Sequence, residues 1–266
     1  MQNKLGTLWL IGAGNMGGSL LAQWRRTDIC DRYVAIDPGD PPIPDGVEHV
    51  SSFDKVEGAP DLVVLAVKPH LAEAAAKGLT DRLGPDTLVI SVMAGLQLAG
   101  LREAVPGGKL VRAMPNTPVS IGKGLTGLYG EDLTDSDRQR LTDFFGVTGA
   151  AVWLEEEAQF DALTAVSGSG PAYIFRMAEA LAAAGESAGL PPELAYKLAE
   201  GTVSGAGALL ASDERTAEEL RKAVTSPNGT TQAGLEALDA DPGLPSLVRN
   251  AVRAAAQRSR ELASGS

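Results

Sequence analysis

A glycine-rich loop near the beginning of the sequence has the spacing of a dinucleotide-binding turn. The segment Gly12–Gly17 reads G-A-G-N-M-G, follows an apolar run at Thr7–Ile11 and precedes a helix-like stretch at Ser19–Arg26. In this context the first glycine permits a tight turn, the second lets a pyrophosphate approach the backbone, and the third lets helix and strand pack closely. Free amides at the start of the helix favour an anion. The loop therefore predicts a site for NADH or NADPH.

An acidic residue at the end of the second predicted strand bears on the choice between these cofactors. Asp37 stands 20 residues after the third glycine, where a carboxylate accepts hydrogen bonds from the ribose hydroxyls of NAD and repels the 2′-phosphate of NADP. No Lys or Arg lies between Arg32 and Lys55 to compensate for that phosphate. The pattern favours NADH, although Asp37 could instead simply open the turn Asp37–Asp40.

The elements that position these residues alternate between strand and helix up to about residue 155. The strand-like runs are Thr7–Ile11, Tyr33–Ile36, Leu62–Ala66, Leu88–Val92, Lys109–Met114, Leu125–Tyr129 and Ala150–Trp153. The run at Leu62–Ala66 is apolar throughout, as is typical of a parallel strand covered by helices on both faces. We therefore predict a doubly wound, Rossmann-like α/β domain over residues 1–156, with ligands at the carboxyl ends of its strands.

Strand-like runs are absent from residues 157–266, which are rich in alanine. Glycine and proline divide this part: Gly168–Pro171 opens a helix, Pro191–Pro192 starts the next, and Asp241–Pro242 precedes the last. Thr216–Glu219 matches a capping box. These features predict an all-helical dimerisation domain over residues 157–266. Alanine-rich helices make a thin core, so we expect them to be buried against a second copy of the chain.

Five further segments occur together with the glycine loop. They are Ala66–Pro69 (A-V-K-P), Ser91–Gly95 (S-V-M-A-G), Arg112–Pro118 (R-A-M-P-N-T-P), Ala165–Tyr173 (A-V-S-G-S-G-P-A-Y) and Thr225–Thr231 (T-S-P-N-G-T-T). Together the six motifs resemble the pyrroline-5-carboxylate reductases over essentially the whole chain. The main departure is Asn228, where that family usually has a second glycine. Asn tolerates a positive φ, so the loop can still form.

The resemblance implies reduction of a cyclic imine that carries a carboxylate, giving proline in the last step of proline biosynthesis. Hydride from the nicotinamide would attack the C=N carbon, and a hydroxyl near the ring nitrogen would suffice, because that nitrogen can take its proton from solvent. By this analogy Thr231 is that hydroxyl. Ser226 and the backbone amides around Gly229 and Thr230 would hold the carboxylate. Taken alone, the same segment would read as a helix cap and a turn.

The remaining candidate contacts come from the other motifs. On the substrate side they are Asn228, Ser169 and Gly170. On the cofactor side the full set is Gly12, Gly14, Asn15, Met16, Gly17, Asp37, Ala66, Val67, Lys68, Pro69, Met93, Ala94, Gly95 and Pro115. Small residues in these turns would also serve a simple strand-to-helix connection. Arg112 and Asn116 flank Met114–Pro115 without an assigned role, and His70 suits the start of a helix better than a catalytic acid.

Two other functions share parts of this pattern. A dehydrogenase of the 3-hydroxyacid type would need a lysine in the helix after the glycine turn, but none occurs between Pro171 and Lys197. A redox sensor could bind NAD(H) through the first domain and use the helices only to dimerise. Such a sensor would need no substrate hydroxyl within Ser226–Thr231.

The amino-acid composition limits the classes of partner that the protein can bind and the cellular compartments that suit it. The 266 residues include 34 acidic and 23 basic side chains, a formal net charge of −11 that argues against binding nucleic acid. One cysteine, Cys30, cannot form an internal disulfide, which suits a reducing compartment, and two histidines leave little for a metal. No apolar run approaches the roughly 18 residues of a membrane span. We expect a cytoplasmic homodimer, with larger rings of dimers left open, that binds a small substrate, no membrane and no metal.

Overall fold

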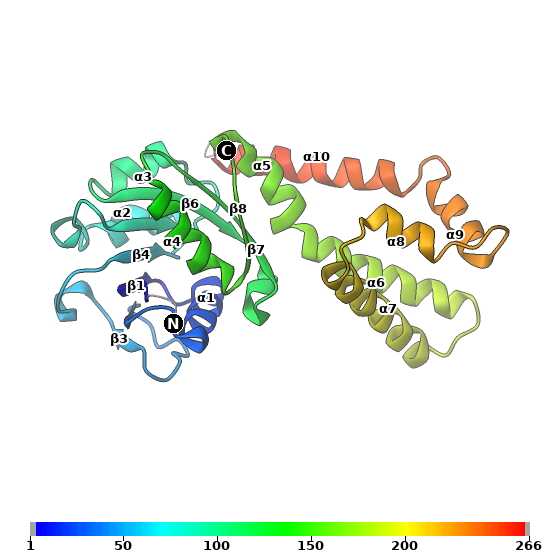
Figure 1. Ribbon diagram of the computed structural model, residues 1–266, viewed down its shortest axis with the longest axis horizontal. Helices are drawn as coiled ribbons and strands as arrows, with labels where there is room; N and C mark the ends of the chain where they lie inside the picture. The colour runs from blue at the N-terminus through cyan, green and yellow to red at the C-terminus, as the bar shows by residue number, and fades with distance from the viewer. Residues whose placement is uncertain (1–3, 264–266) are drawn as a thin grey trace. The chain divides into compact units, whose positions relative to one another are not determined.

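Residues 4–263 are described by a computed structural model (Figure 1). The chain divides into two compact units. The sheet unit comprises residues 4–168 together with 255–263, and the helical unit comprises Ser169–Ala254. The sheet unit therefore contains both the beginning and the end of the described chain.

One mixed sheet organises the sheet unit. Its strands are β1 (Thr7–Ile11), β2 (Arg32–Ile36), β3 (Glu48–Val50), β4 (Leu62–Leu65), β5 (Leu88–Ser91), β6 (Lys109–Pro115), β7 (Gly124–Gly130) and β8 (Gly149–Trp153). Their order is β3-β2-β1-β4-β5-β6-β7-β8. All neighbours are parallel except β6 and β7. The strand order reverses beside β1, so the carboxyl ends of β1 and β4 form the crevice in which such sheets bind ligands.

Helices cover both faces of this sheet. Those of the sheet unit are α1 (Asn15–Thr27), α2 (Ala72–Ala76), α3 (Leu98–Ala104), α4 (Asp135–Gly146) and α5 (Phe160–Leu163), followed by a π-helical turn at Thr164–Gly168. Leu8 and Leu10 of β1 join a core with α1 and α4, whereas Trp9 and Ile11 join a second core with α2 and α3. Because successive side chains of a strand point to opposite faces, one apolar strand feeds two cores. The predicted doubly wound fold is confirmed.

The central strands agree with the sequence prediction to within a residue or two, but one strand was missed. Strand β3 is only three residues long, and Glu48 and His49 within it are exposed. Such a strand carries neither the continuous apolar run of a buried strand nor a clear alternation, so pattern analysis had no signal to detect. It pairs with β2 and places Val50 opposite Ile36.

The helices of the helical unit begin and end near the glycine and proline residues that divide its sequence. Its helices are α6 (Gly170–Ser187), α7 (Pro192–Ser212), α8 (Ala217–Ala223), α9 (Thr230–Asp239) and α10 (Leu244–Ala263), the last of which ends in the sheet unit. Thr216 and Glu219 form the predicted capping box at α8. Gly189 has φ +100° directly after the C-cap of α6, a conformation that glycine adopts without strain. None of the helices within residues 4–263 is long and apolar enough to cross a membrane.

Residues on β6 and directly after it contact residues 157–168, the segment that precedes the helical unit in the chain. Arg112 forms an ion pair with Glu157 (Nη1–Oε1 2.8 Å), and its guanidinium lies 4.2 Å from the centre of the Phe160 ring. A Cβ on Gly168 would lie 3.3 Å from Cε of Met114. Asn116 donates to Ser167. These contacts place residues 157–168 in the sheet unit, whereas the sequence-based division into domains falls at residue 156.

Candidate dinucleotide and substrate sites

The first and third glycines of the loop are required by the protein itself. Gly12 has φ +89°, and a Cβ there would lie 2.9 Å from the carbonyl oxygen of Ala66 and 2.8 Å from Cγ1 of Val67. A Cβ on Gly17 would overlap the carbonyl oxygen of Gly12. Ala66 and Val67 thus form the wall against which the loop turns. Their small or β-branched side chains follow from this close approach as well as from any ligand.

The second glycine has no such role. Gly14 is the exposed N-cap of α1, and a Cβ on it would meet no heavy atom within 4 Å. The loop around Gly14 is therefore open toward solvent at the position where a dinucleotide would place its pyrophosphate against the backbone. Because the N-cap is a glycine, it has no side chain that could accept a hydrogen bond from the first amides of the helix. The free amides at the start of this helix suit an anionic group, so these residues fit the cofactor.

Asp37 lies directly against this loop. Its Oδ2 accepts a hydrogen bond of 2.8 Å from the backbone N–H of Ala13, and its Oδ1 accepts one of 2.8 Å from the N–H of Gly39. The second bond is the turn-opening contact considered from the sequence. The first brings the carboxylate to the glycine loop. Each oxygen keeps a further lone pair, so Asp37 can still accept hydrogen bonds from a ribose.

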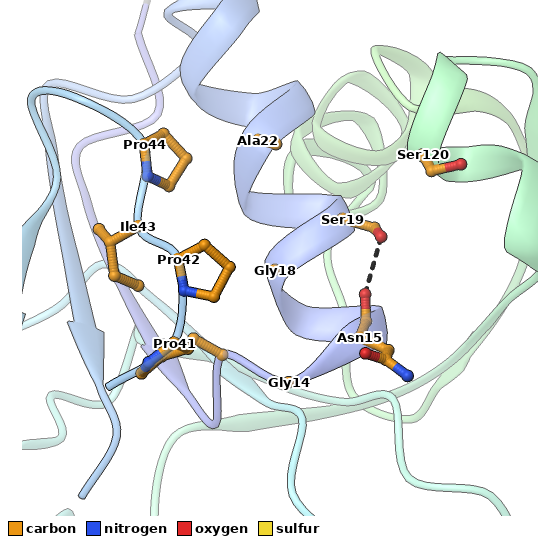
Figure 2. A pocket seen from close by; sticks show the side chains of 11 residues that line it. Gly14, Asn15, Gly18, Ser19, Ala22, Pro41, Pro42, Ile43, Pro44 and Ser120 are labelled. Atoms are coloured by element: carbon orange, nitrogen blue, oxygen red, sulfur yellow. Dashed lines mark hydrogen bonds between the residues drawn. The ribbon is translucent and has the colours of Figure 1, made fainter. Parts of the chain in front are cut away.

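A cavity of about 750 Å³ adjoins the loop. Figure 2 shows Pro41, Pro42, Ile43 and Pro44 running along one side of α1, with Ser120 on the other side. The N-cap Gly14 and the small α1 residues Gly18 and Ala22 line the cavity, together with Asn15 and Ser19. Ser19 Oγ donates to the carbonyl oxygen of Asn15 over 2.7 Å. Among the described residues that line this cavity there is no Lys or Arg.

The other predicted cofactor loops follow the neighbouring strands β4, β5 and β6. Lys68 and Pro69 are exposed after β4, where Lys68 caps a short 3₁₀ helix. After β5, Met93 is buried, Ala94 is exposed and Gly95 has φ +82°. The carboxyl ends of these parallel strands meet at the same edge of the sheet as the glycine loop, which brings the three loops to one ligand-binding edge.

Pro115 ends β6 at a place where its missing N–H costs little. It pairs with Thr126 of β7, whereas the pairing of β6 with β5 has already ended at Arg112. A proline is tolerated where a strand lacks a neighbour on one side. Met16, the remaining loop candidate, is half-buried against the core shared by α1 and α4.

The predicted substrate residues belong to the helical unit. Gly229 is the N-cap of α9 and Thr231 lies in its first turn, with an exposed side chain that makes no hydrogen bond within residues 4–263. Asn228 has φ +57°, a conformation that Asn tolerates better than most residues, and its N–H donates to Gln232 Oε1 (2.8 Å). Ser226 and Thr230 are also exposed. Ser169 and Gly170 open α6.

Two family models match the chain. One, described as pyrroline-5-carboxylate reductase dimerisation, matches residues 157–262, and the other, described as NADP oxidoreductase, coenzyme F420-dependent, matches residues 7–95. A pyrroline-5-carboxylate reductase of Pseudomonas aeruginosa is 39% identical over 261 residues, which cover 95% of this chain and 95% of that relative. The chain belongs to the pyrroline-5-carboxylate reductase family.

Two solved structures of pyrroline carboxylate reductases superpose on nearly the full length of this chain. A pyrroline-5-carboxylate reductase from Coxiella burnetii superposes with a TM-score of 0.87 at 33% identity, covering 96% of this chain and 97% of that one. The enzyme from Plasmodium falciparum, solved with NADP bound, gives a TM-score of 0.81 at 29% identity and 99% coverage of both chains. The family resemblance and the assignment to the NAD(P)H-dependent oxidoreductases are confirmed, which removes the dehydrogenase and sensor alternatives.

The sequence of this chain did not predict the contacts made by β3. His49 of β3 places Nε2 3.1 Å from the carbonyl oxygen of Asp37, so the strand braces the turn that follows β2. Arg112 and Asn116, which had no assigned role from the sequence, form contacts with residues 157–168. The residues 4–263 contain no group of three or more side chains that could hold a metal ion.

Proposed function

We propose that this chain reduces pyrroline-5-carboxylate to L-proline with NADH or NADPH. The observation that carries the proposal is the open glycine loop, Gly12–Gly17, in a chain that belongs to the reductase family along its whole length. The bound cofactor supplies the hydride that reduces the C=N carbon. The residues of the chain bind and orient the two reactants and stabilise the nitrogen as its charge changes.

On the cofactor side, we assign the pyrophosphate to the amides of Gly14, Asn15 and Met16 at the start of α1. Asp37 takes the adenosine ribose. The loops after β4, β5 and β6 take the rest of the cofactor, through Ala66–Pro69, Met93–Gly95 and Pro115. These loops share one edge of the sheet with the glycine loop, which supports this assignment.

We assign NADH as the preferred cofactor. The three cations that precede Asp37 most closely in sequence are each engaged with other groups. Arg32 pairs with Glu48, and Arg26 donates to Gln23. Arg25 donates to the Asp45 carbonyl and contacts Asp28. A 2′-phosphate beside the Asp37 carboxylate would therefore meet negative charge without a compensating guanidinium or ammonium.

On the substrate side, Thr231 donates its hydroxyl to the imine nitrogen. The amides of Gly229 and Thr230, with Ser226 and Asn228, hold the carboxylate at the start of α9. Ser169 and Gly170 contribute from the start of α6. The exposed hydroxyl of Thr231, which has no partner among residues 4–263, supports this role.

The working enzyme is a homodimer formed through the helical unit. Among the described residues of that unit, the buried apolar side chains are three alanines, Ala182, Ala195 and Ala199. Large apolar side chains are exposed instead, including Ile174, Phe175, Leu181, Leu194, Leu198, Leu209, Leu210 and Leu247. A second copy would cover this surface, which is more apolar than a stable monomer exposes. Rings of such dimers remain compatible with the same contact.

A cytoplasmic location completes the proposal. The single cysteine, Cys30, is buried, and burial raises the pKa of its thiol to about 12. A protein with one inert thiol and no disulfide suits a reducing compartment.

The decisive experiment measures oxidation of NADH and of NADPH by the purified protein in the presence of pyrroline-5-carboxylate. We expect oxidation of both, with kcat/KM for NADH at least equal to that for NADPH. Light scattering at micromolar concentration should give at least twice the mass of one chain. A folded protein that oxidises neither cofactor would disprove the proposed activity, and a monomeric mass would disprove the dimer.

A further inference from the structure

The contact between Asp37 and Ala13 joins the ribose end of the cofactor site to its pyrophosphate end. The Ala13 N–H lies between the first two glycines of the loop, and Asp37 Oδ2 accepts from it at 2.8 Å. Ala13 is buried, with 3% of its surface exposed. Its N–H would lack this protein partner if the carboxylate were removed. A buried amide without a partner is costly, so the loop would have to rearrange or admit water.

The backbone on either side of this contact is otherwise fixed. The Gly12 N–H donates to the carbonyl oxygen of Ile36 over 3.0 Å, which continues the pairing of β1 with β2. Gly18 N–H donates to the Gly14 carbonyl oxygen over 2.7 Å and begins α1. Between these two anchors, the Asp37 carboxylate holds Ala13, the residue that precedes the open glycine. The conformation presented to a pyrophosphate at Gly14 therefore depends on Asp37.

We infer that Asp37 is a positioning residue for the glycine loop as well as the residue that selects between NADH and NADPH. This inference rests on the proposed cofactor site. It means that one carboxylate has two effects of opposite sign on the affinity for NADPH. The negative charge repels the 2′-phosphate, whereas the hydrogen bond to Ala13 supports the pyrophosphate that both cofactors share.

Two substitutions separate these effects. Asp37→Asn removes the charge and keeps one amide oxygen that can accept from Ala13, but its NH2 cannot accept from Gly39. Asp37→Ala removes the charge and both acceptors. The two variants therefore both lose the Gly39 bond and differ from each other in the acceptor for Ala13. Asp40→Asn is the matched control, because it removes a charge from the same turn, and Asp40 makes no hydrogen bond or ion pair with the other residues in the described part of the chain.

The test measures dissociation constants of NADH and NADPH by titration calorimetry with the full chain, so that it does not depend on the imine substrate. We expect Asp37→Asn to bind NADPH more tightly than the wild type. We expect Asp37→Ala to bind NADPH about tenfold more weakly than Asp37→Asn, the scale of one hydrogen bond to a neutral amide oxygen. Asp40→Asn should change the NADH constant less than twofold.

Hydrogen exchange supplies a second readout. Peptides that contain Ala13 should lose protection in Asp37→Ala but keep it in Asp37→Asn, because local opening exposes an amide that has lost its acceptor. Equal NADPH affinities in Asp37→Asn and Asp37→Ala, or unchanged protection in the alanine variant, would overturn the positioning role. A wild-type chain that binds neither cofactor would instead overturn the proposed function.

Discussion

Asn116 and Ser167 join the end of β6 to the π-helical turn at Thr164–Gly168. The Asn116 Nδ2 donates to the Ser167 carbonyl oxygen at 3.3 Å and to Ser167 Oγ at 3.2 Å. The Oδ1 of the same side chain accepts from the Leu125 N–H at 2.8 Å. One amide group therefore connects two strands and the segment that leads to the helical unit, and it uses both its donor and its acceptor.

This arrangement predicts a loss of stability on substitution. Asn116→Ala should lower the free energy of unfolding by about 1–3 kcal/mol, because it leaves the Leu125 N–H and both Ser167 oxygens without this partner. Asn116→Asp should also be less stable than the wild type, because its carboxylate still accepts from Leu125 but faces the Ser167 carbonyl oxygen, which cannot donate. Urea denaturation followed by circular dichroism would measure both. Equal stability of the wild type and the alanine variant would show that water replaces the side chain without cost.

The second and third glycines of the loop should respond differently to substitution by alanine. Gly14→Ala should keep the melting temperature of the wild type, because its Cβ meets nothing within 4 Å, but should weaken NADH binding about tenfold or more by obstructing the pyrophosphate. Gly17→Ala should lower stability by about 1–3 kcal/mol, the usual cost of overpacking, because its Cβ overlaps the Gly12 carbonyl. Thermal unfolding and NADH titration on both variants test this contrast. A destabilised Gly14→Ala chain would contradict it.

Substitution of Thr231 should affect the chemical step. Thr231→Ala is expected to reduce kcat/KM for the imine roughly 10–100-fold, with the larger effect on kcat, because the hydroxyl assists as the nitrogen changes charge. Thr231→Ser should retain most activity, and the dissociation constant of NADH should not change.

Thr230→Ala is the matched control for that experiment. It lies one residue earlier in the same first turn of α9 and keeps the backbone amide to which we assign carboxylate binding. Its kcat should stay within about threefold of the wild type. A folded, dimeric Thr231→Ala enzyme with unchanged kcat/KM for the imine would show that the segment serves as a helix cap and that the proton comes from water alone.

The start of α4 should make stability depend on acid pH. Burial alone would raise the pKa of Asp137, but hydrogen bonds from Lys109 (2.8 Å) and from Thr134 outweigh it and hold that pKa below its ordinary value. A carboxylate with a lowered pKa in the folded state stabilises the protein above the unfolded pKa of about 3.9, and this contribution disappears as the pH falls through the folded value.

Asp137→Asn should therefore be less stable than the wild type at pH 7, and the difference should shrink below about pH 4. Asp86→Asn is its control, because Asp86 also contacts Lys109 (3.3 Å) but its side chain is 88% exposed. An exposed pair of this kind contributes little. Thermal melts of the three proteins between pH 3 and pH 7 measure the dependence. A difference as large at pH 3 as at pH 7 would contradict the assignment.

The sequence predicted those features that depend on local pattern. Strands β1, β4 and β5 are apolar on both faces, so a short run marks each of them, and the capping box at Thr216 identifies its helix. The functional loops follow from family motifs. The contacts of Asp37 with Ala13 and of Arg112 with Glu157 join residues 24 and 45 positions apart, and depend on how strands and turns meet in the folded chain. No pattern of residue spacing in the sequence predicts contacts between residues so far apart along the chain.

Helix α10 returns the chain to the unit in which it began. Its Ser259 Oγ donates to Asp161 Oδ1 (2.7 Å), and a Cβ on Gly95 would lie 3.6 Å from the backbone carbonyl carbon of Leu262. The helical unit is thus inserted within the sheet unit instead of being appended to it. A fragment that stops at Gly168 would lack the residues that pack beside a cofactor loop. Limited proteolysis must cut the chain twice, near 168 and near 255, before the sheet unit is released.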